Sequence, residues 1–196
     1  MKQVYWFPLV CLLLLLSACL TVEQISTRII FEQDKNVIRI HILYDNIASA
    51  EAVEKDVEAD FEYLIDQVED EAYLLERLEQ GFYMKNRRLF IAGGKIMAEE
   101  ELITRDPESL KKEFGLVLDS ARWMLPIDKG DDDFEVIAHN GTLLKVGDKS
   151  HLIWPETTGE IYLQSRLREL PEHFEQNRRH MVRKLEQYLE VVKDKE

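Results

Sequence analysis

The chain has 196 residues, of which 45% are hydrophobic and 32% charged, and its formal net charge at pH 7 is −13. This composition is typical of a folded globular protein and excludes a wholly disordered chain. The acidic balance also argues against nucleic acid or anionic lipid as a general partner, because both would repel the chain.

The amino-terminal segment has the pattern of an export signal. An apolar run from Val4 to Leu20 is 17 residues long, whereas a helix needs about 20 residues to cross a bilayer. Lys2 precedes the run, and no cation follows it before Arg28. A stop-transfer flank is therefore missing, and the sequence favours a secretory signal over a membrane-spanning helix.

The tetrad Leu16-Ser17-Ala18-Cys19 ends this run. It resembles the lipobox of bacterial lipoproteins. The resemblance implies that residues 1–18 are removed by cleavage between Ala18 and Cys19, that the Cys19 sulfur carries a diacylglycerol, and that the new amine is usually acylated too. Two or three acyl chains hold a protein on a membrane effectively permanently. The alternative is an ordinary signal or an uncleaved anchor, with Cys19 as a small apolar residue.

The residue after the cysteine bears on localisation. Leu20 stands there rather than Asp, which resembles the signal for onward transport to an outer membrane. The resemblance thus implies an exported, membrane-anchored protein, facing the periplasm from the outer membrane where the host has one. Residues 19–25 are predicted to be the lipidated cysteine and a short tether.

The remaining chain is predicted to form a single domain over residues 26–196. Removing the first 18 residues leaves 178, with a net charge of −14 because the removed part carries only Lys2. That length suits one domain with a substantial core. The only cysteines are Cys11 and Cys19, so the domain has no disulfide, no thiol nucleophile and no cysteine-rich zinc site.

The first elements of the domain are predicted to be a hairpin and a helical segment. Residues 26–33 and 36–44 alternate apolar and polar side chains on either side of a polar turn, as half-buried strands do. Over residues 51–82 the apolar residues recur every three or four positions. This spacing predicts one long amphipathic helix, or two joined by a bend. The apolar stripe comprises Val53, Val57, Phe61, Leu64, Val68, Ala72, Leu75, Leu78 and Phe82.

The opposite face of this segment is strongly acidic. Residues 51–79 contain 12 acidic side chains and two basic ones, Lys55 and Arg77. Such a face could bind a basic partner or divalent cations, but most charged helical faces are simply solvated.

Two further elements are predicted in the middle of the chain. Gly93-Gly94 lies between short apolar runs, which favours a second hairpin. Asp106 and Pro107 are suited to begin a helix, which is predicted to end near Leu125, before Pro126.

An acidic loop over residues 128–133 then precedes strand candidates around Asn140-Gly141, Gly147 and Gly159. The loop lacks the ligand spacing of a calcium site. Since Asn-Gly is a strong hairpin signal, three or four antiparallel strands in a meander are expected.

The last element is an amphipathic helix over residues 171–193. It carries a basic cluster that could contact anionic headgroups or pair with neighbouring acidic helices. The cluster consists of Arg178, Arg179, Arg183 and Lys184. The predicted fold is therefore α+β, with an antiparallel sheet of hairpins and a meander covered by the long acidic helix and the C-terminal helix.

The sequence contains no known catalytic motif. His139 and His151 lie in neighbouring strand candidates, where a shared site could form only after folding. No catalytic residue, metal site or cofactor is predicted. Three hypotheses remain: a non-enzymatic envelope adaptor or structural lipoprotein with a protein partner, a small-ligand or cation-binding module, and a hydrolase whose residues converge only on folding.

Overall fold

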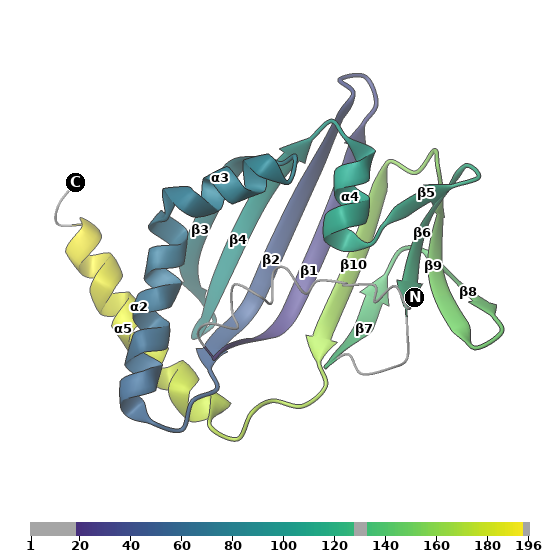
Figure 1. The fold of residues 1–196 in the computed structure, drawn as a ribbon. Helices are drawn as coiled ribbons and strands as arrows, with labels where there is room; N and C mark the ends of the chain where they lie inside the picture. Colours follow the sequence, from purple (N-terminus) through teal and green to yellow (C-terminus); the bar gives the residue numbers. More distant parts are fainter. Residues whose placement is uncertain (1–18, 128–132, 194–196) are drawn as a thin grey trace.

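The computed structural model describes residues 19–127 and 133–193, and it confirms the α+β class. Two antiparallel sheets and several helices share one hydrophobic core (Figure 1). The six-stranded sheet has the order β3-β4-β2-β1-β10-β7, and the four-stranded sheet has the order β5-β6-β9-β8. The strands of the larger sheet are β1 Leu20–Glu32, β2 Val37–Ser49, β3 Tyr83–Ala92, β4 Lys95–Thr104, β7 Phe134–His139 and β10 Glu160–Leu167. Those of the smaller sheet are β5 Val117–Asp119, β6 Arg122–Ile127, β8 Thr142–Val146 and β9 Lys149–Pro155.

The N-terminal hairpin forms as predicted but is longer at its open end. β1 begins at Leu20, which pairs with Ser49, and the pairing continues through Ile25 opposite Tyr44. Leu20 and Val22 are buried, while Thr21 and Glu23, which follow them in turn, are partly exposed. This is the alternation of a half-buried strand. The prediction of a tether over residues 19–25 is therefore corrected: from Leu20 onward these residues belong to the sheet.

The acidic segment forms two helices, in agreement with the bent alternative. They are α2 Glu54–Glu69 and α3 Glu71–Glu79. Asp70 between them has an extended backbone, and its side chain accepts a hydrogen bond from the Ala72 N–H, which caps α3. α2 buries the predicted Val57, Phe61 and Leu64.

The break at Asp70 changes which face of α3 is buried. Tyr73 and Arg77 are buried, whereas Leu74, Leu75 and Leu78 are exposed. The predicted apolar stripe is thus wrong for α3, because the extended residue resets the helical phase that a continuous helix would have kept.

The third helix is shorter than predicted. α4 Pro107–Phe114 begins at the predicted Asp106 cap and ends at Gly115, whose φ of 65° is left-handed. The Gly115 and Leu116 N–H groups donate back to the Lys111 and Leu110 carbonyls, as in the usual glycine termination of a helix. The expected helical residues 117–125 instead form β5 and most of β6, and Pro126 lies within β6.

The strands after Asp133 do not follow the predicted meander. β8 and β9 pair as a hairpin, but β7 pairs with β10 in the larger sheet. Asn140-Gly141 is consequently a corner at which the chain passes between sheets. The Asn140 Oδ1 accepts from the Tyr162 N–H and the Trp154 Nε1–H, both at 2.8 Å, and its Nδ2 donates to the Glu160 carbonyl.

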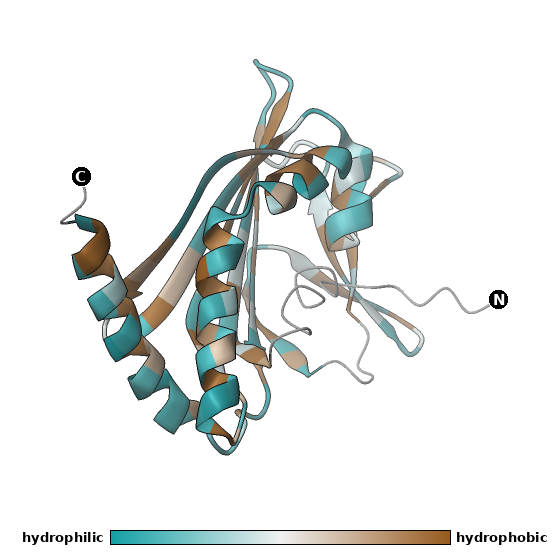
Figure 2. Ribbon diagram, turned by 60° about the vertical axis from the view of Figure 1, so that its left-hand side comes forward, coloured by the Kyte–Doolittle hydropathy of each residue, from teal (hydrophilic) through white to brown (hydrophobic). Residues whose placement is uncertain are grey.

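Both sheets contribute to the core on one face of the larger sheet. Ile29 of β1, Phe114 of α4 and Trp154 of β9 belong to a single cluster of buried side chains. Phe31 of β1 stacks on Trp123 of β6, with ring centroids 4.9 Å apart. α2 and α3 cover the β2–β4 part of the same face, and α2 and α5 alternate hydrophobic and hydrophilic residues along their lengths (Figure 2).

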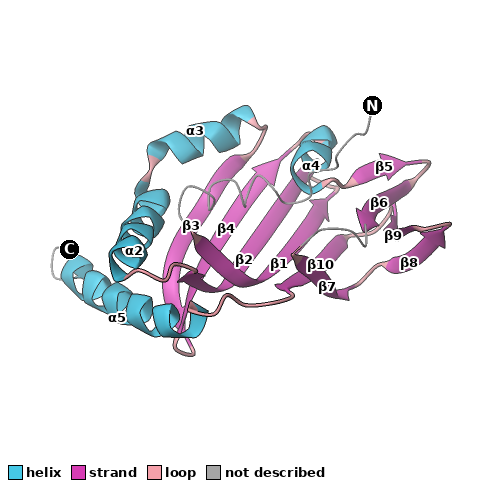
Figure 3. Ribbon diagram, turned by 60° about the horizontal axis from the view of Figure 1, so that its bottom comes forward, coloured by secondary structure: helices cyan, strands magenta, loops and turns pink. Residues whose placement is uncertain are grey.

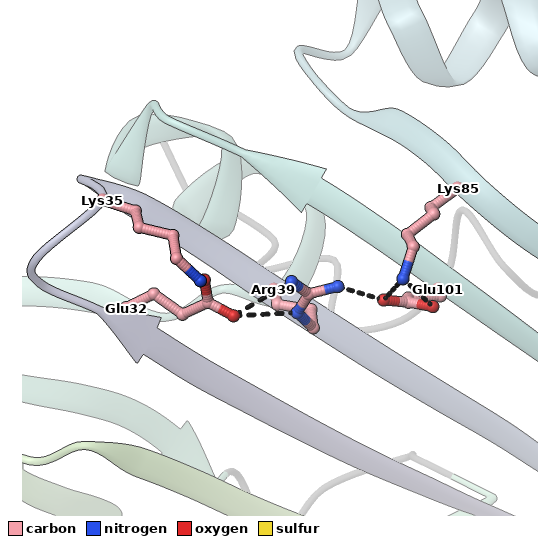
Figure 4. Close-up of polar contacts among 5 residues, drawn as sticks. All are labelled: Glu32, Lys35, Arg39, Lys85 and Glu101. Carbon is pink, nitrogen blue, oxygen red and sulfur yellow. Dashed lines mark hydrogen bonds and ion pairs between the residues drawn. The ribbon is translucent and has the colours of Figure 1, made fainter.

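The opposite face carries a row of alternating charges across four elements (Figure 4). Arg39 of β2 lies between Glu32 of β1 and Glu101 of β4, and it forms ion pairs with both. Lys35 pairs with Glu32 at 2.9 Å, and Lys85 of β3 pairs with Glu101 at 3.0 Å. This face is therefore polar but internally satisfied.

The C-terminal helix α5, Phe174–Lys193, packs on β2 and β4 beside α2 (Figure 3). Its apolar face is buried as an amphipathic helix requires, and Phe174, Met181 and Leu185 are fully buried. Of the acidic loop 128–133, only Asp133 lies within the described residues, and its carbonyl accepts from the Arg168 N–H.

Candidate functional site

Cys19 lies at the open end of the β1–β2 hairpin, immediately before β1. The cysteine is exposed, while the next side chain, Leu20, is buried beneath α2. Successive side chains of a strand point to opposite sides. The Cys19 side chain is therefore directed away from the core, toward solvent. Ala18, the other residue of the predicted cleavage site, lies outside the described residues.

The main chain of Cys19 is held at both of its polar groups. Its N–H donates to Asp60 Oδ1 of α2 at 3.1 Å, and its carbonyl accepts from the Ala50 N–H at 2.7 Å. The side chain is thus exposed, while the backbone that carries it is fixed to the end of β2 and to the middle of α2.

Asp60 belongs to a buried polar network. Its Oδ2 accepts from the Ser49 hydroxyl, and Ser49 Oγ in turn accepts from the Glu51 N–H at 3.1 Å. Asn177 of α5 donates its amide group to the carbonyls of Ser49 at 3.0 Å and Glu51 at 2.7 Å. The network connects the start of the domain with α2, the end of β2 and α5.

The electrostatic environment of Cys19 is negative. A hydrogen bond to Glu51, burial, and the charges of Glu51, Asp60 and Asp56 raise the pKa of the Cys19 thiol to about 11. Burial also raises the pKa of Asp60, although hydrogen bonds from Ser49 and Cys19 oppose that effect. At neutral pH Cys19 is consequently a thiol and not a reactive thiolate.

Sequence reasoning found Cys19 but missed Asp60, which it placed on the solvated acidic face. Only 4% of Asp60 is exposed. One signal was available, because Asp60 lies three residues after Val57 and four before Leu64, within the apolar stripe. The partners Ser49 and Asn177 are remote in sequence and gave no signal.

A pocket lies between the larger sheet and the two helices α2 and α3. Its cavity volume is about 70 Å³. Most of its lining is apolar, but Gln67, Arg87 and Glu100 contribute polar groups. Two of these polar atoms are buried without a hydrogen-bond partner among the described residues: the acceptor Gln67 Oε1 and the donor Arg87 Nη1. Glu100 is the one carboxylate among these lining residues.

The two histidines of the sequence analysis lie in different sheets. His139 ends β7, where its Nδ1 lies 3.0 Å from the Gly141 carbonyl, and His151 lies in β9 opposite Pro126 and Leu144. Nothing in the described chain brings them into a shared site. Within the same residues, no group of three or more His, Cys, Asp or Glu side chains is arranged to hold a metal ion.

The basic cluster on α5 is partly neutralised by its neighbours. Lys184 pairs with Glu58 of α2, which also contacts His180 Nε2 at 2.9 Å. Arg178 pairs with Glu175 and donates to the Gly94 carbonyl. Arg179 and Arg183 form no ion pair with any residue that the structure describes. Pairing with an acidic helix therefore accounts for part of the cluster.

Comparison with protein-family models, with curated proteins and with solved structures finds no match to this chain. Across residues 19–127 and 133–193, no helix combines the length and the apolar character that crossing a bilayer requires.

Proposed function

We propose that the protein is a bacterial envelope lipoprotein that is cleaved before Cys19, anchored through acyl chains on the Cys19 sulfur, and active as a non-enzymatic adaptor or structural component. The sequence supports the anchor through the tetrad Leu16-Ser17-Ala18-Cys19 and the apolar run before it.

The observation that carries the proposal is the position of Cys19. Its side chain is exposed and is directed away from the core, while its backbone is bonded to Asp60 and Ala50. A diacylglycerol on this sulfur would leave the fold undisturbed. With a lipid on Cys19, the folded domain would lie directly beside the membrane, because β1 begins at the next residue.

Metabolic labelling tests the anchor. Cells expressing the full chain are grown with a labelled fatty acid, and we expect the label on the wild type and not on Cys19→Ala. Cys11→Ala is the matched control, because Cys11 lies within the segment to be removed and should leave the label unchanged. A wild-type protein without label would refute the anchor.

The adaptor role is supported by apolar side chains that the fold leaves in solvent. Leu74, Leu75 and Leu78 are exposed on α3, and every residue of the edge strand β8 is exposed. Apolar groups gathered on a surface are typical of protein-binding sites.

Cross-linking in intact cells followed by mass spectrometry tests this role, with Cys19→Ala behind an ordinary cleavable signal as the unanchored control. If the protein is an adaptor, we expect one abundant cross-linked envelope protein with the wild type, and we expect this cross-link to be missing in the unanchored control. Equal cross-linking in both forms, or no specific partner in either, contradicts it.

The pocket beneath α2 and α3 favours a second candidate, a small-ligand carrier. An apolar lining with a few unsatisfied polar groups is the usual character of a ligand site. A thermal-shift screen with neutral amphiphiles bearing an amide or hydroxyl group tests it. Ala98→Leu, which narrows the pocket, should abolish any stabilisation, and stabilisation that persists in this variant argues against the pocket.

A further inference from the structure

Asp60 is a buried carboxylate without a counter-ion among the described residues. It is 4% exposed, yet no Lys, Arg or His lies within ion-pair distance of it. Its contacts are a hydroxyl and a backbone N–H. Burying a carboxylate without a compensating cation is strongly unfavourable, so an unpaired Asp60 requires an explanation.

The backbone atom that Asp60 binds is the one that processing would change. Cleavage before Cys19 converts the Cys19 N from an amide nitrogen into a primary amine, which is protonated near neutral pH. That nitrogen already lies 3.1 Å from Asp60 Oδ1. We propose that the α-ammonium group of processed Cys19 is the counter-ion of Asp60, so that cleavage creates a buried ion pair that fixes the new amino terminus to α2. This inference rests on the cleavage step of the proposed function.

The surrounding charges support the pairing. Glu51, at the end of the β2 segment, and Asp56, in the first turn of α2, both raise the pKa of Asp60 and of the Cys19 thiol through their negative charge. The field that disfavours a thiolate favours an ammonium group at the same residue. α5 contacts Ser49 through the uncharged Asn177 and Met181. The nearby cationic groups of α5, Lys184 and His180, pair with Glu58 instead of Asp60.

The usual role of acidic residues near a helix N-terminus does not explain Asp60. Glu54 and Asp56 lie in the first turn of α2 and can stabilise the positive end of the helix. Asp60 lies almost two turns into α2 and is buried against β2, where the helix-end effect has fallen away.

The pairing has a chemical consequence for the anchor. An ammonium group bound to Asp60 must stay unacylated, because an acylated nitrogen carries no charge. This differs from the acylated amine that the lipobox resemblance usually implies. The mature chain should therefore carry a diacylglycerol on sulfur and a free amine. Mass spectrometry of the N-terminal lipopeptide should find two acyl chains, and a third chain on nitrogen would overturn the inference.

The pairing can be measured without lipid. Two chains carrying Cys19→Ser are prepared, one beginning at residue 19 and one at Ser17, which places the amine two residues away. Both contain every residue of the core, which starts at Leu20. We expect the chain beginning at residue 19 to have an unfolding equilibrium constant on the order of tenfold smaller at pH 7, because hydrogen bonds between charged groups are stronger than neutral ones. The difference should vanish as the pH rises above the amine pKa.

Substitutions and a titration complete the test. Asp60→Asn should abolish the difference between the two chains, while Glu62→Gln, on the exposed face of α2, should preserve it. NMR titration of residue 19 in the shorter chain, which needs no Asp60 variant, should give an amine pKa above its ordinary value of about 8. A pKa at or below that value, or equal stability of the two chains, overturns the pairing. Failure of fatty-acid labelling with the pairing intact would refute the lipid anchor alone.

Discussion

Among single residues, Arg77 has the least exposed charged side chain in the described chain. It is 1% exposed, forms ion pairs with Glu113 and Glu100, and donates from Nε to the Tyr73 hydroxyl at 2.8 Å. Tyr73 also donates to Glu100 and lies beneath the guanidinium of Arg87, whose Cζ is 3.9 Å from the ring centroid. Two guanidinium groups and two carboxylates are thus gathered within a small volume between α3, α4 and the β3–β4 hairpin.

Removing Arg77 should take an ion-pair partner from each of two buried carboxylates, Glu113 and Glu100. We expect Arg77→Met to lower the free energy of unfolding by about 3–5 kcal/mol, as for other broken buried pairs. Arg28→Met is the matched control, because Arg28 pairs with Glu160 at a site where both side chains are about half exposed. Its effect should stay below about 1 kcal/mol. Urea denaturation of both variants measures the difference, and equal effects would contradict the role given to burial.

The charge row of Figure 4 predicts a loss of stability in acid. Burial raises the pKa of Glu101, but hydrogen bonds from Arg39 and Lys85 outweigh burial and lower it below 4.5, and hydrogen bonds from Lys35 and Arg39 lower the pKa of Glu32. Because the unfolded state binds these protons more readily, the stabilisation is present above about pH 4.5 and is lost as the pH falls through the folded-state pKa values.

The urea concentration at the unfolding midpoint should therefore decrease as the pH is lowered from 5 to 3. For Glu101→Gln it should decrease less steeply than for the wild type. Glu156→Gln, in the exposed turn after β9, serves as the control and should retain the wild-type slope. If the urea midpoint of Glu101→Gln depended on pH as that of the wild type does, the charge row would not contribute to the loss of stability in acid.

Among the elements, the corner at Asn140-Gly141 decides how the two sheets meet. A Cβ on Gly141 would lie 2.5–2.8 Å from the indole of Trp154, which is buried and bonded to Asn140. Gly141→Ala should therefore lower the free energy of unfolding by about 1–3 kcal/mol, as overpacked sites do. Gly159→Ala is the control, since nothing lies within 4 Å of a Cβ there. Urea denaturation measures the free energy of unfolding of both variants. A Gly141→Ala protein as stable as the wild type would mean that the backbone at this corner can move to make room for the methyl group.

The same corner shows what the sequence could reveal about the elements. The hairpins at Asp34-Lys35-Asn36 and Gly93-Gly94 were predictable because their strands are adjacent in sequence and their turn residues are suited to the turn. Asn140-Gly141 has the same local signal, but its pairing is decided by Trp154 and Tyr162, which lie 14 and 22 residues away. Gly115 and Asp70 likewise end helices that the apolar spacing alone would have continued.

The candidate site likewise contains one residue that the sequence could predict and several that it could not. Cys19 could be found from a contiguous motif, whereas Asp60, Ser49 and Asn177 meet only after β2, α2 and α5 have packed together. Buried polar networks of this kind carry little local sequence signal, because each member is an ordinary residue in its own element.

In the molecule as a whole, the two sheets should unfold together. Their facing side chains form one buried cluster, and Trp123 and Trp154 of the smaller sheet pack on the larger one. We expect tryptophan fluorescence, which reports on the smaller sheet, and far-UV circular dichroism, which reports on the whole fold, to give the same urea midpoint. A fluorescence transition at a lower urea concentration than the circular dichroism transition would mean that the smaller sheet unfolds as a separate unit.

In the proposed lipoprotein, the pairing of β1 from its first residue would determine how far the protein can act from its anchor. A lipoprotein on a flexible linker searches a volume whose radius depends on the linker length. Here the lipid position is followed directly by a strand of 13 residues, which at about 3.3 Å per residue extends roughly 40 Å. With the lipid on Cys19, the turn at Asp34-Lys35-Asn36 would stay at that nearly constant distance from the attachment point. The fold itself would therefore select partners by their distance from the membrane.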